Sequence, residues 1–144
     1  GPLWGRLQHG LPVTLSDGRE VVSSDVMGPA RRGRKFSYVT DTLPLPTIAE
    51  EVAGSDLLLC EGMFESELTE TAHDKKHMTA LEAGKIAAEA GDVRRMGLIH
   101  YSPRYTERDL KRLATEASAV FPATFLTRDR QHIPIPYPDG DDDD

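Results

Sequence analysis

Three short apolar runs, each stopped by a polar or charged residue, constrain the possible folds of this chain most strongly. The runs cover residues 36–40, 56–60 and 96–99, and they are followed in turn by Asp41, Glu61 and His100. A run of this length bounded by turn-forming residues is typical of a buried strand. Ligand sites in open α/β sheets lie at the carboxyl ends of the strands. The pattern therefore predicts a sheet that brings an aspartate, a glutamate and a histidine to one edge.

Helical periodicity between these runs predicts a layered α/β domain with no internal boundary. The predicted helices cover residues 45–53, 79–90 and 106–120, with a partly helical stretch at 65–76. A short hairpin is expected over residues 11–22, a loop at 27–34, and a terminal hairpin formed by 123–127 and 131–135. No internal repeat is present.

Composition limits the class of protein. The chain has 144 residues, a single cysteine (Cys60) and a net charge of −7. Five of its acidic residues lie in the tail 139–144. Such a run of like charges predicts a disordered tail. One cysteine excludes an intrachain disulfide and fits a reducing compartment, so a cytoplasmic location is expected. No apolar run approaches the length of a membrane span, so no membrane partner is expected.

Charge alone does not indicate a nucleic-acid binder, because phosphate affinity requires clustered Lys and Arg. The one basic cluster covers residues 31–35. It fits either a solvated loop before a strand or a phosphate contact, and the loop is the simpler interpretation.

The candidate chemistry rests on two carboxylates and two imidazoles: Asp41, Glu61, His77 and His100. Carboxylate and imidazole are suitable ligands for Zn²⁺ or Mn²⁺. His77 paired with Glu61 could supply a proton to a leaving oxygen. Each residue also has a structural interpretation, as a helix cap, a turn residue or a surface histidine. Two ligands do not complete a catalytic zinc site, which takes three protein ligands and a water.

Five short segments resemble ribonuclease Z, the tRNA 3′-processing endonuclease family of the metallo-β-lactamase superfamily. The segments are G-P-L-W-G-R-L (1–7), Y-V-T-D-T (38–42), L-L-C-E-G-M-F (58–64), H-M-T-x-x-E-A (77–83) and H-Y-S-P-R-Y (100–105). Their order and spacing agree with the family from residue 1 to about 136. The paired motifs around Glu61 and His77 distinguish ribonuclease Z from other members of the superfamily.

The resemblance implies a role for each candidate. Asp41 resembles the carboxylate that bridges two zinc ions, and His100 the last metal-binding histidine. Glu61 and His77 occupy the positions of the glutamate and histidine that act together as proton donor to the leaving ribose oxygen. Arg104 corresponds to a basic residue near the substrate phosphates.

The sequence also departs from the family pattern. Cys60 replaces the histidine before the glutamate, Gly62 and Met63 replace Ala-Thr, and Met78 replaces a serine. The signature H-x-H-x-D-H is absent, as is the arm that grips the tRNA elbow. Residues 1–138 are thus expected to form the C-terminal half of a metallo-β-lactamase αββα sandwich, followed by the acidic tail 139–144.

The resemblance implies that the complete protein is a two-zinc endoribonuclease, with Mn²⁺ as an alternative metal. It would remove the 3′ trailer from tRNA precursors and act as a homodimer, while the isolated chain would be inactive. Two alternatives stay open. The chain could be a non-catalytic half that pairs with a complementary chain, or part of another metallo-β-lactamase-fold phosphodiesterase.

Overall fold

The computed structural model describes residues 2–28 and 32–137. Contacts divide the chain into two compact units, Gly1–Arg32 and Gly33–Asp144. The division lies within the loop predicted at 27–34, although the sequence pattern predicts no boundary there. The assignment of residues 1–138 to one half-domain stays a prediction, and the acidic tail 139–144 lies outside the described residues. No described helix combines the length and apolar character needed to cross a membrane.

The first unit contains the predicted hairpin. Its elements are α1 (Pro2–Gln8), β1 (Val13–Thr14), β2 (Glu20–Val21) and α2 (Ser23–Val26). The two strands are antiparallel, with Val13 opposite Val21, which confirms the hairpin. Gly18 has a φ of 86° in the turn, a conformation that glycine adopts at little cost. Leu7 and Val13 are the buried apolar residues of this unit.

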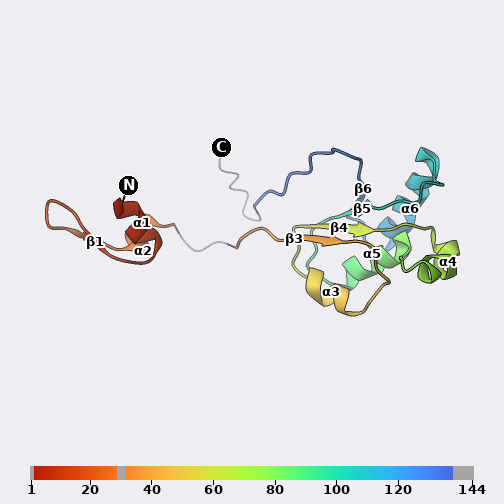
Figure 1. Cartoon of the computed structure of the whole chain (residues 1–144), viewed down its shortest axis with the longest axis horizontal. Helices are drawn as coiled ribbons and strands as arrows, with labels where there is room; N and C mark the ends of the chain where they lie inside the picture. The colour runs from red at the N-terminus through yellow and green to blue at the C-terminus, as the bar shows by residue number, and fades with distance from the viewer. Residues whose placement is uncertain (1, 29–31, 138–144) are drawn as a thin grey trace. The chain divides into compact units, whose positions relative to one another are not determined.

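A four-stranded parallel sheet forms the centre of the second unit (Figure 1). Its strands follow the chain order: β3 (Phe36–Val39), β4 (Leu57–Glu61), β5 (Met96–Ile99) and β6 (Thr124–Leu126). The three apolar runs of the sequence form β3, β4 and β5. The predicted α/β architecture is therefore confirmed.

The helices of the second unit connect these parallel strands. They are α3 (Thr47–Val52), the short 3₁₀ turn η1 (Ser66–Leu68), α4 (Thr69–Asp74), α5 (Ala80–Glu89) and α6 (Glu107–Val120). Thr79 starts α5 through a capping box, since its hydroxyl accepts from the Glu82 amide while the Glu82 carboxylate accepts from Thr79. Lys35, from the basic cluster, donates to the carbonyls of Glu51 and Ala53 at the end of α3. Such cations stabilise a helix C-terminus.

The predicted terminal hairpin is wrong. β6 pairs in parallel with β5, with Gly97 opposite Phe125, instead of pairing with residues 131–135. Two arginines hold that segment, because Arg34 donates to the Ile135 carbonyl and Arg95 to the Pro134 carbonyl. An apolar strand sequence does not encode which neighbour it pairs with, so a local turn signal suggested the nearer partner.

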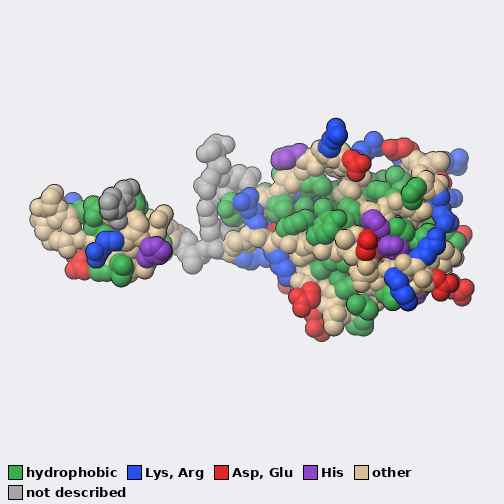
Figure 2. Space-filling view, viewed as in Figure 1, with side chains coloured by type: hydrophobic (Ala, Val, Ile, Leu, Met, Phe, Trp, Pro, Cys, Tyr) green, Lys and Arg blue, Asp and Glu red, His purple; other side chains and the backbone are tan. Residues whose placement is uncertain are grey.

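Within residues 33–137, the helices of the second unit pack on one face of the sheet and leave the other face uncovered. The core between the sheet and helices α3, α5 and α6 is built from small and aliphatic side chains, including Val52, Leu58, Met96, Leu98 and Leu113. On the opposite face, Phe36 and Tyr38 are 51% and 60% exposed. Parallel strands are normally covered on both faces. Figure 2 shows hydrophobic side chains as a broad patch on the visible side of this unit.

Candidate metal and acid–base site

The ends of β3, β4 and β5 bring the predicted site residues together. The register places Glu61 opposite Ile99, the last residue of β5. Asp41 follows β3 by two residues, and His100 follows β5 directly. Since the strands are parallel, their carboxyl ends meet at one edge of the sheet. The three side chains therefore converge, as the sequence pattern predicts.

Asp41 and His100 contact each other across this edge. The His100 Nε2 lies 3.2 Å from the Asp41 Oδ1. Both residues adopt the left-handed backbone conformation, with φ of 52° and 59°. This conformation is uncommon for residues other than glycine and clusters at functional sites. Both strands thus end in a strained residue whose side chain enters the same cluster.

Glu61 is a buried carboxylate with several partners. Its side chain is 0% exposed. Oε1 accepts from the Thr42 amide, and Oε2 lies 2.9 Å from the Nδ1 of His77, with the Met78 amide at 3.5 Å. His100 Nδ1 lies 4.0 Å from the same Oε2. These partners satisfy the hydrogen-bonding capacity of a carboxyl group that is removed from solvent.

His77 reaches the site from the loop between α4 and α5. The loop turns at Lys76, whose φ is 65°, and the His77 amide donates to the Ala72 carbonyl. The two imidazole ring centres of His77 and His100 are 5.1 Å apart. Because Nδ1 of His77 faces Glu61, its Nε2 is left for another partner.

The donor atoms of Asp41, His77 and His100 all lie within 4.8 Å of one another. Two imidazoles and a carboxylate suit Zn²⁺ or Mn²⁺, and three protein ligands is the number that a catalytic zinc takes. The residues present therefore fit a transition-metal ion. The sequence predicts Asp41 and His100 as ligands and His77 as an acid, whereas the geometry would let His77 serve either purpose.

Arg104 follows His100 by four residues and lies against Phe64. Its guanidinium carbon is 5.3 Å from the centre of the Phe64 ring, and the side chain is exposed. Within the described part of the chain it makes no ion pair with Asp41 or Glu61. Its predicted contact with substrate phosphates stays a prediction.

Sequence reasoning missed several neighbours of the site. Lys75 also lies over the Phe64 ring, with its Nζ 5.8 Å from the ring centre. The Thr42 amide is a donor to Glu61 that no side-chain motif could indicate. These contacts depend on the path of two loops, which spacing in the sequence does not define.

Cys60 is not part of the polar cluster. Its thiol is fully buried and lies 3.9 Å from the sulfur of Met78. Burial, followed by the charge of Glu61, raises the pKa of the Cys60 thiol to about 12. The thiolate is the form that binds metals, so this cysteine is not expected to be a ligand.

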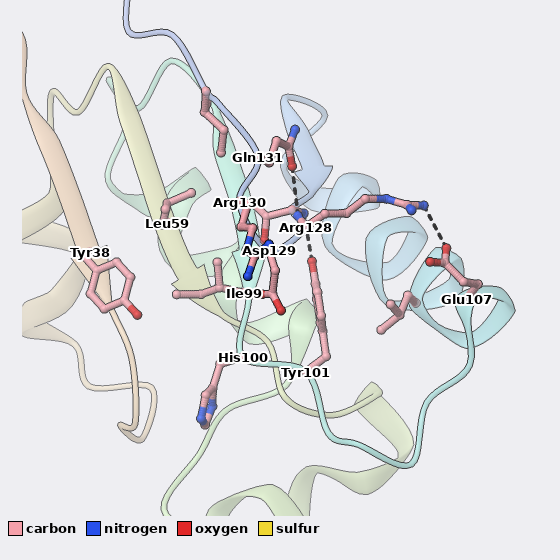
Figure 3. A pocket seen from close by; sticks show the side chains of 13 residues that line it. Tyr38, Leu59, Ile99, His100, Tyr101, Glu107, Arg128, Asp129, Arg130 and Gln131 are labelled. Carbon is pink, nitrogen blue, oxygen red and sulfur yellow. Dashed lines mark hydrogen bonds and ion pairs between the residues drawn. The ribbon is translucent and has the colours of Figure 1, made fainter.

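An open hollow of about 980 Å³ adjoins His100 (Figure 3). It lies over the sheet face without helices, and its lining includes Tyr38, Leu59, His100, Tyr101 and Arg128. The Tyr101 hydroxyl donates to the Leu98 carbonyl and accepts from the Thr127 amide. Burial raises the pKa of the Tyr101 phenol above its ordinary value of 10.0. The hydrogen bonds of its hydroxyl group therefore hold the Tyr101 side chain in place in the lining of the hollow, which also includes His100.

Two curated proteins similar to this chain are both named Ribonuclease Z. The chain is 53% identical over 139 residues to Ribonuclease Z of Treponema denticola, and 43% identical over 135 residues to Ribonuclease Z of Gemmatimonas aurantiaca. These matches cover 96% and 94% of the chain but only 45% and 42% of the relatives. The chain therefore spans less than half the length of these curated relatives. No protein-family model matches the sequence.

Solved structures similar to this chain have the metallo-β-lactamase fold that the sequence predicts. The metallo-beta-lactamase fold protein YhfI from Bacillus subtilis matches 63% of the chain, with a TM-score of 0.55 and 28% identity, over 35% of its own length. Human tRNase Z, short form, matches 81% of the chain, with a TM-score of 0.55, over 37% of its own length. At 21% identity, the human protein indicates the fold alone. The predicted metallo-β-lactamase fold is confirmed.

Proposed function

We propose that the complete protein is a tRNA 3′-processing endonuclease. The proposal starts from the similarity of this chain to ribonuclease Z and from its metallo-β-lactamase fold. This chain would supply the acid–base pair and part of the metal centre. The observation that carries the proposal is the cluster of Asp41, His77 and His100 donor atoms, with Glu61 buried against His77. Such a cluster suits hydrolysis of a phosphodiester.

Asp41 and His100 are the residues proposed to hold metal, with two zinc ions in the complete site or Mn²⁺ in their place. A bound metal ion of this type would lower the pKa of water and stabilise charge on phosphoryl oxygens. Asp41 is 66% exposed on its side chain, so it is accessible to an ion from solvent. His100 is oriented towards it through Nε2.

Glu61 and His77 are proposed to act together in the transfer of one proton to the leaving oxygen. Glu61 accepts a hydrogen bond from Nδ1 of His77, which fixes the orientation of the ring and leaves Nε2 directed away from the carboxylate. The Nε2–H of His77 can then donate to the leaving 3′ oxygen as the bond between that oxygen and phosphorus breaks. The attacking water forms the new bond to phosphorus, so the two products are a 3′ hydroxyl and a 5′ phosphate.

The proposed substrate is a tRNA precursor, bound by an enzyme that acts as a homodimer in the cytoplasm. Arg104 is proposed to contact a phosphate of the RNA. A guanidinium suits this purpose because it can donate two parallel hydrogen bonds to one phosphate.

A second candidate function is a non-catalytic half that pairs with a complementary chain. The exposed Phe36 and Tyr38 side chains on the uncovered sheet face favour it, since contiguous apolar surface marks an interaction site. A third candidate is another metallo-β-lactamase-fold phosphodiesterase, since the similarity to YhfI indicates this fold without indicating an RNA substrate.

Turnover by the complete protein tests the proposal. We expect cleavage of tRNA precursor to exceed hydrolysis of bis(p-nitrophenyl) phosphate, and the chain alone to be inactive. Glu61→Gln and His77→Ala should each lower kcat by roughly 10²- to 10⁴-fold, the usual contribution of an acid–base group. The double variant should lose little more than the worse single variant, because the two residues act as a unit. His132→Ala, at an exposed histidine far along the chain, is the control.

Each contrary outcome identifies an alternative. Equal or better hydrolysis of the small diester would favour the third candidate. Absence of turnover by the complete protein with either zinc or manganese would favour the non-catalytic half.

A further inference from the structure

Two cationic side chains share one buried aromatic ring beside the site. Phe64 is 1% exposed, and both the Arg104 guanidinium and the Lys75 ammonium lie within 6 Å of its ring centre, at 5.3 and 5.8 Å. Cations within this distance of an aromatic face are attracted to it. Phe64 therefore lies within cation–π distance of two exposed positive charges.

The two cations come from the two loops that carry the histidines. Lys75 precedes His77 by two residues, and Arg104 follows His100 by four. The ring belongs to the segment that follows Glu61 at the end of β4. Both charges are therefore placed by the same short stretches that build the candidate site.

Backbone hydrogen bonds keep the Phe64 segment between these loops. On one side, Phe64 forms a parallel bridge with Thr79, and the Met63 amide donates to the Met78 carbonyl. On the other side, the Ser102 amide donates to the Met63 carbonyl at 3.3 Å. These hydrogen bonds hold the Phe64 ring, to which both cations are attracted, between the two loops.

Neither cation is neutralised by an acidic partner within the described residues. Nearby arginines differ in this respect, because Arg112 pairs with Glu65 and Arg128 pairs with Glu107. The whole chain carries a net charge of −7, so two cations without an acidic partner among the described residues are a local exception. Figure 2 shows Lys and Arg side chains next to the group of His and acidic side chains on the visible face.

We propose that Lys75 adds a second contact to the RNA phosphates next to the scissile phosphodiester, beside the contact already proposed for Arg104, with Phe64 as their common support. The proposal deepens the proposed function, on which it rests. Lysine acts as a point charge, while arginine donates two hydrogen bonds to one phosphate. Contacts to phosphate position a strand without reading its bases, so this pair holds the RNA in register for cleavage.

The test compares two substrates of the complete protein, tRNA precursor and bis(p-nitrophenyl) phosphate. Lys75→Ala should raise KM for the precursor by roughly tenfold, the usual effect of losing one charged hydrogen bond. Hydrolysis of bis(p-nitrophenyl) phosphate, which has no neighbouring phosphate, should stay within about twofold. Lys75→Arg should restore most of the affinity, and Lys75→Ala combined with Arg104→Ala should lose more than either change alone.

An equilibrium measurement separates this proposal from the proposed function. Fluorescence anisotropy with labelled tRNA precursor should give a salt slope that is smaller by roughly 0.7 to 1 in Lys75→Ala. Lys85→Ala on α5 and Arg108→Ala on α6, both exposed, are the charge-matched controls. An unchanged slope, or an equal loss on both substrates, would overturn the proposal. Absence of turnover with an altered slope would instead refute only the proposed nuclease activity.

Discussion

At the residue scale, the candidate site illustrates what residue type and position can predict. Asp41, Glu61 and His100 were identified because each ends an apolar run, and parallel strands bring such positions to one edge. His77 was a candidate partner of Glu61 from residue type and position, its role was strengthened by the family resemblance, and the structure places its Nδ1 2.9 Å from Glu61. The roles of these residues stay predictions. Thr42, Lys75 and Phe64 could not be identified, because their contacts arise from loop paths.

Cys60 leads to a prediction about alkaline pH. Burial raises the pKa of its thiol to about 12, while an unfolded cysteine titrates near ~8.5. Above pH ~8.5 the unfolded chain loses this proton and the folded chain keeps it, so the free energy of unfolding falls as pH rises. The contribution is fully present below pH ~8.5 and decreases by up to ~1.4 kcal/mol per pH unit above it. Urea unfolding of this chain at pH 8 to 9.5 measures the slope.

Cys60→Ala is the control for that slope. Its unfolding free energy should change less with pH over the same interval, whatever its absolute stability. The interval stops at 9.5 because burial also raises the pKa of Tyr101 and Tyr105 from 10.0, and these phenols would add their own dependence at higher pH. An identical slope in the variant would show that the thiol does not remain protonated in the folded chain.

At the element scale, strands and helices were predictable where their length and periodicity were clear. The runs that form β3, β4 and β5, and the patterns that form α5 and α6, were all predicted. The partner of β6 was not, since residues 124–126 lie parallel to β5 while the local turn signal favoured a hairpin. Pairing depends on the packing of α6 and β5, which a short window does not contain.

The loop between α4 and α5 leads to a prediction about the free energy of unfolding. Lys76 adopts a φ of 65°, and its side chain is exposed. A non-glycine residue in this conformation costs about 1 to 2 kcal/mol, which glycine does not incur. Lys76→Gly should therefore raise the free energy of unfolding by about 1 kcal/mol, as measured by urea denaturation, and leave the His77–Glu61 contact in place.

Lys85→Gly in the interior of α5 is the matched control, because it makes the same change of residue at a helical position. It should lower the free energy of unfolding by ~1 kcal/mol. Equal destabilisation of the two variants would show that the left-handed backbone conformation of Lys76 does not lower the stability of this loop.

At the scale of the whole chain, the described part of the second unit holds a sheet with one face packed on helices and one apolar face that its own helices leave uncovered. The chain matches less than half the length of its ribonuclease Z relatives. An uncovered apolar face fits a piece whose remaining partner surface lies elsewhere in those relatives. His100 and the hollow beside it lie at the edge of this face, so whatever covers the face also adjoins the candidate site (Figure 3).

The uncovered face should make this chain associate with itself at high concentration. Phe36 and Tyr38 are exposed on it, and large exposed apolar patches drive association in water. Sedimentation velocity should show concentration-dependent association, together with binding of a hydrophobic dye. Tyr38→Lys should reduce both. Leu45→Lys, at a residue 48% exposed in the loop before α3, should reduce neither. Equal effects of the two substitutions would attribute the association to general surface hydrophobicity instead of to this face.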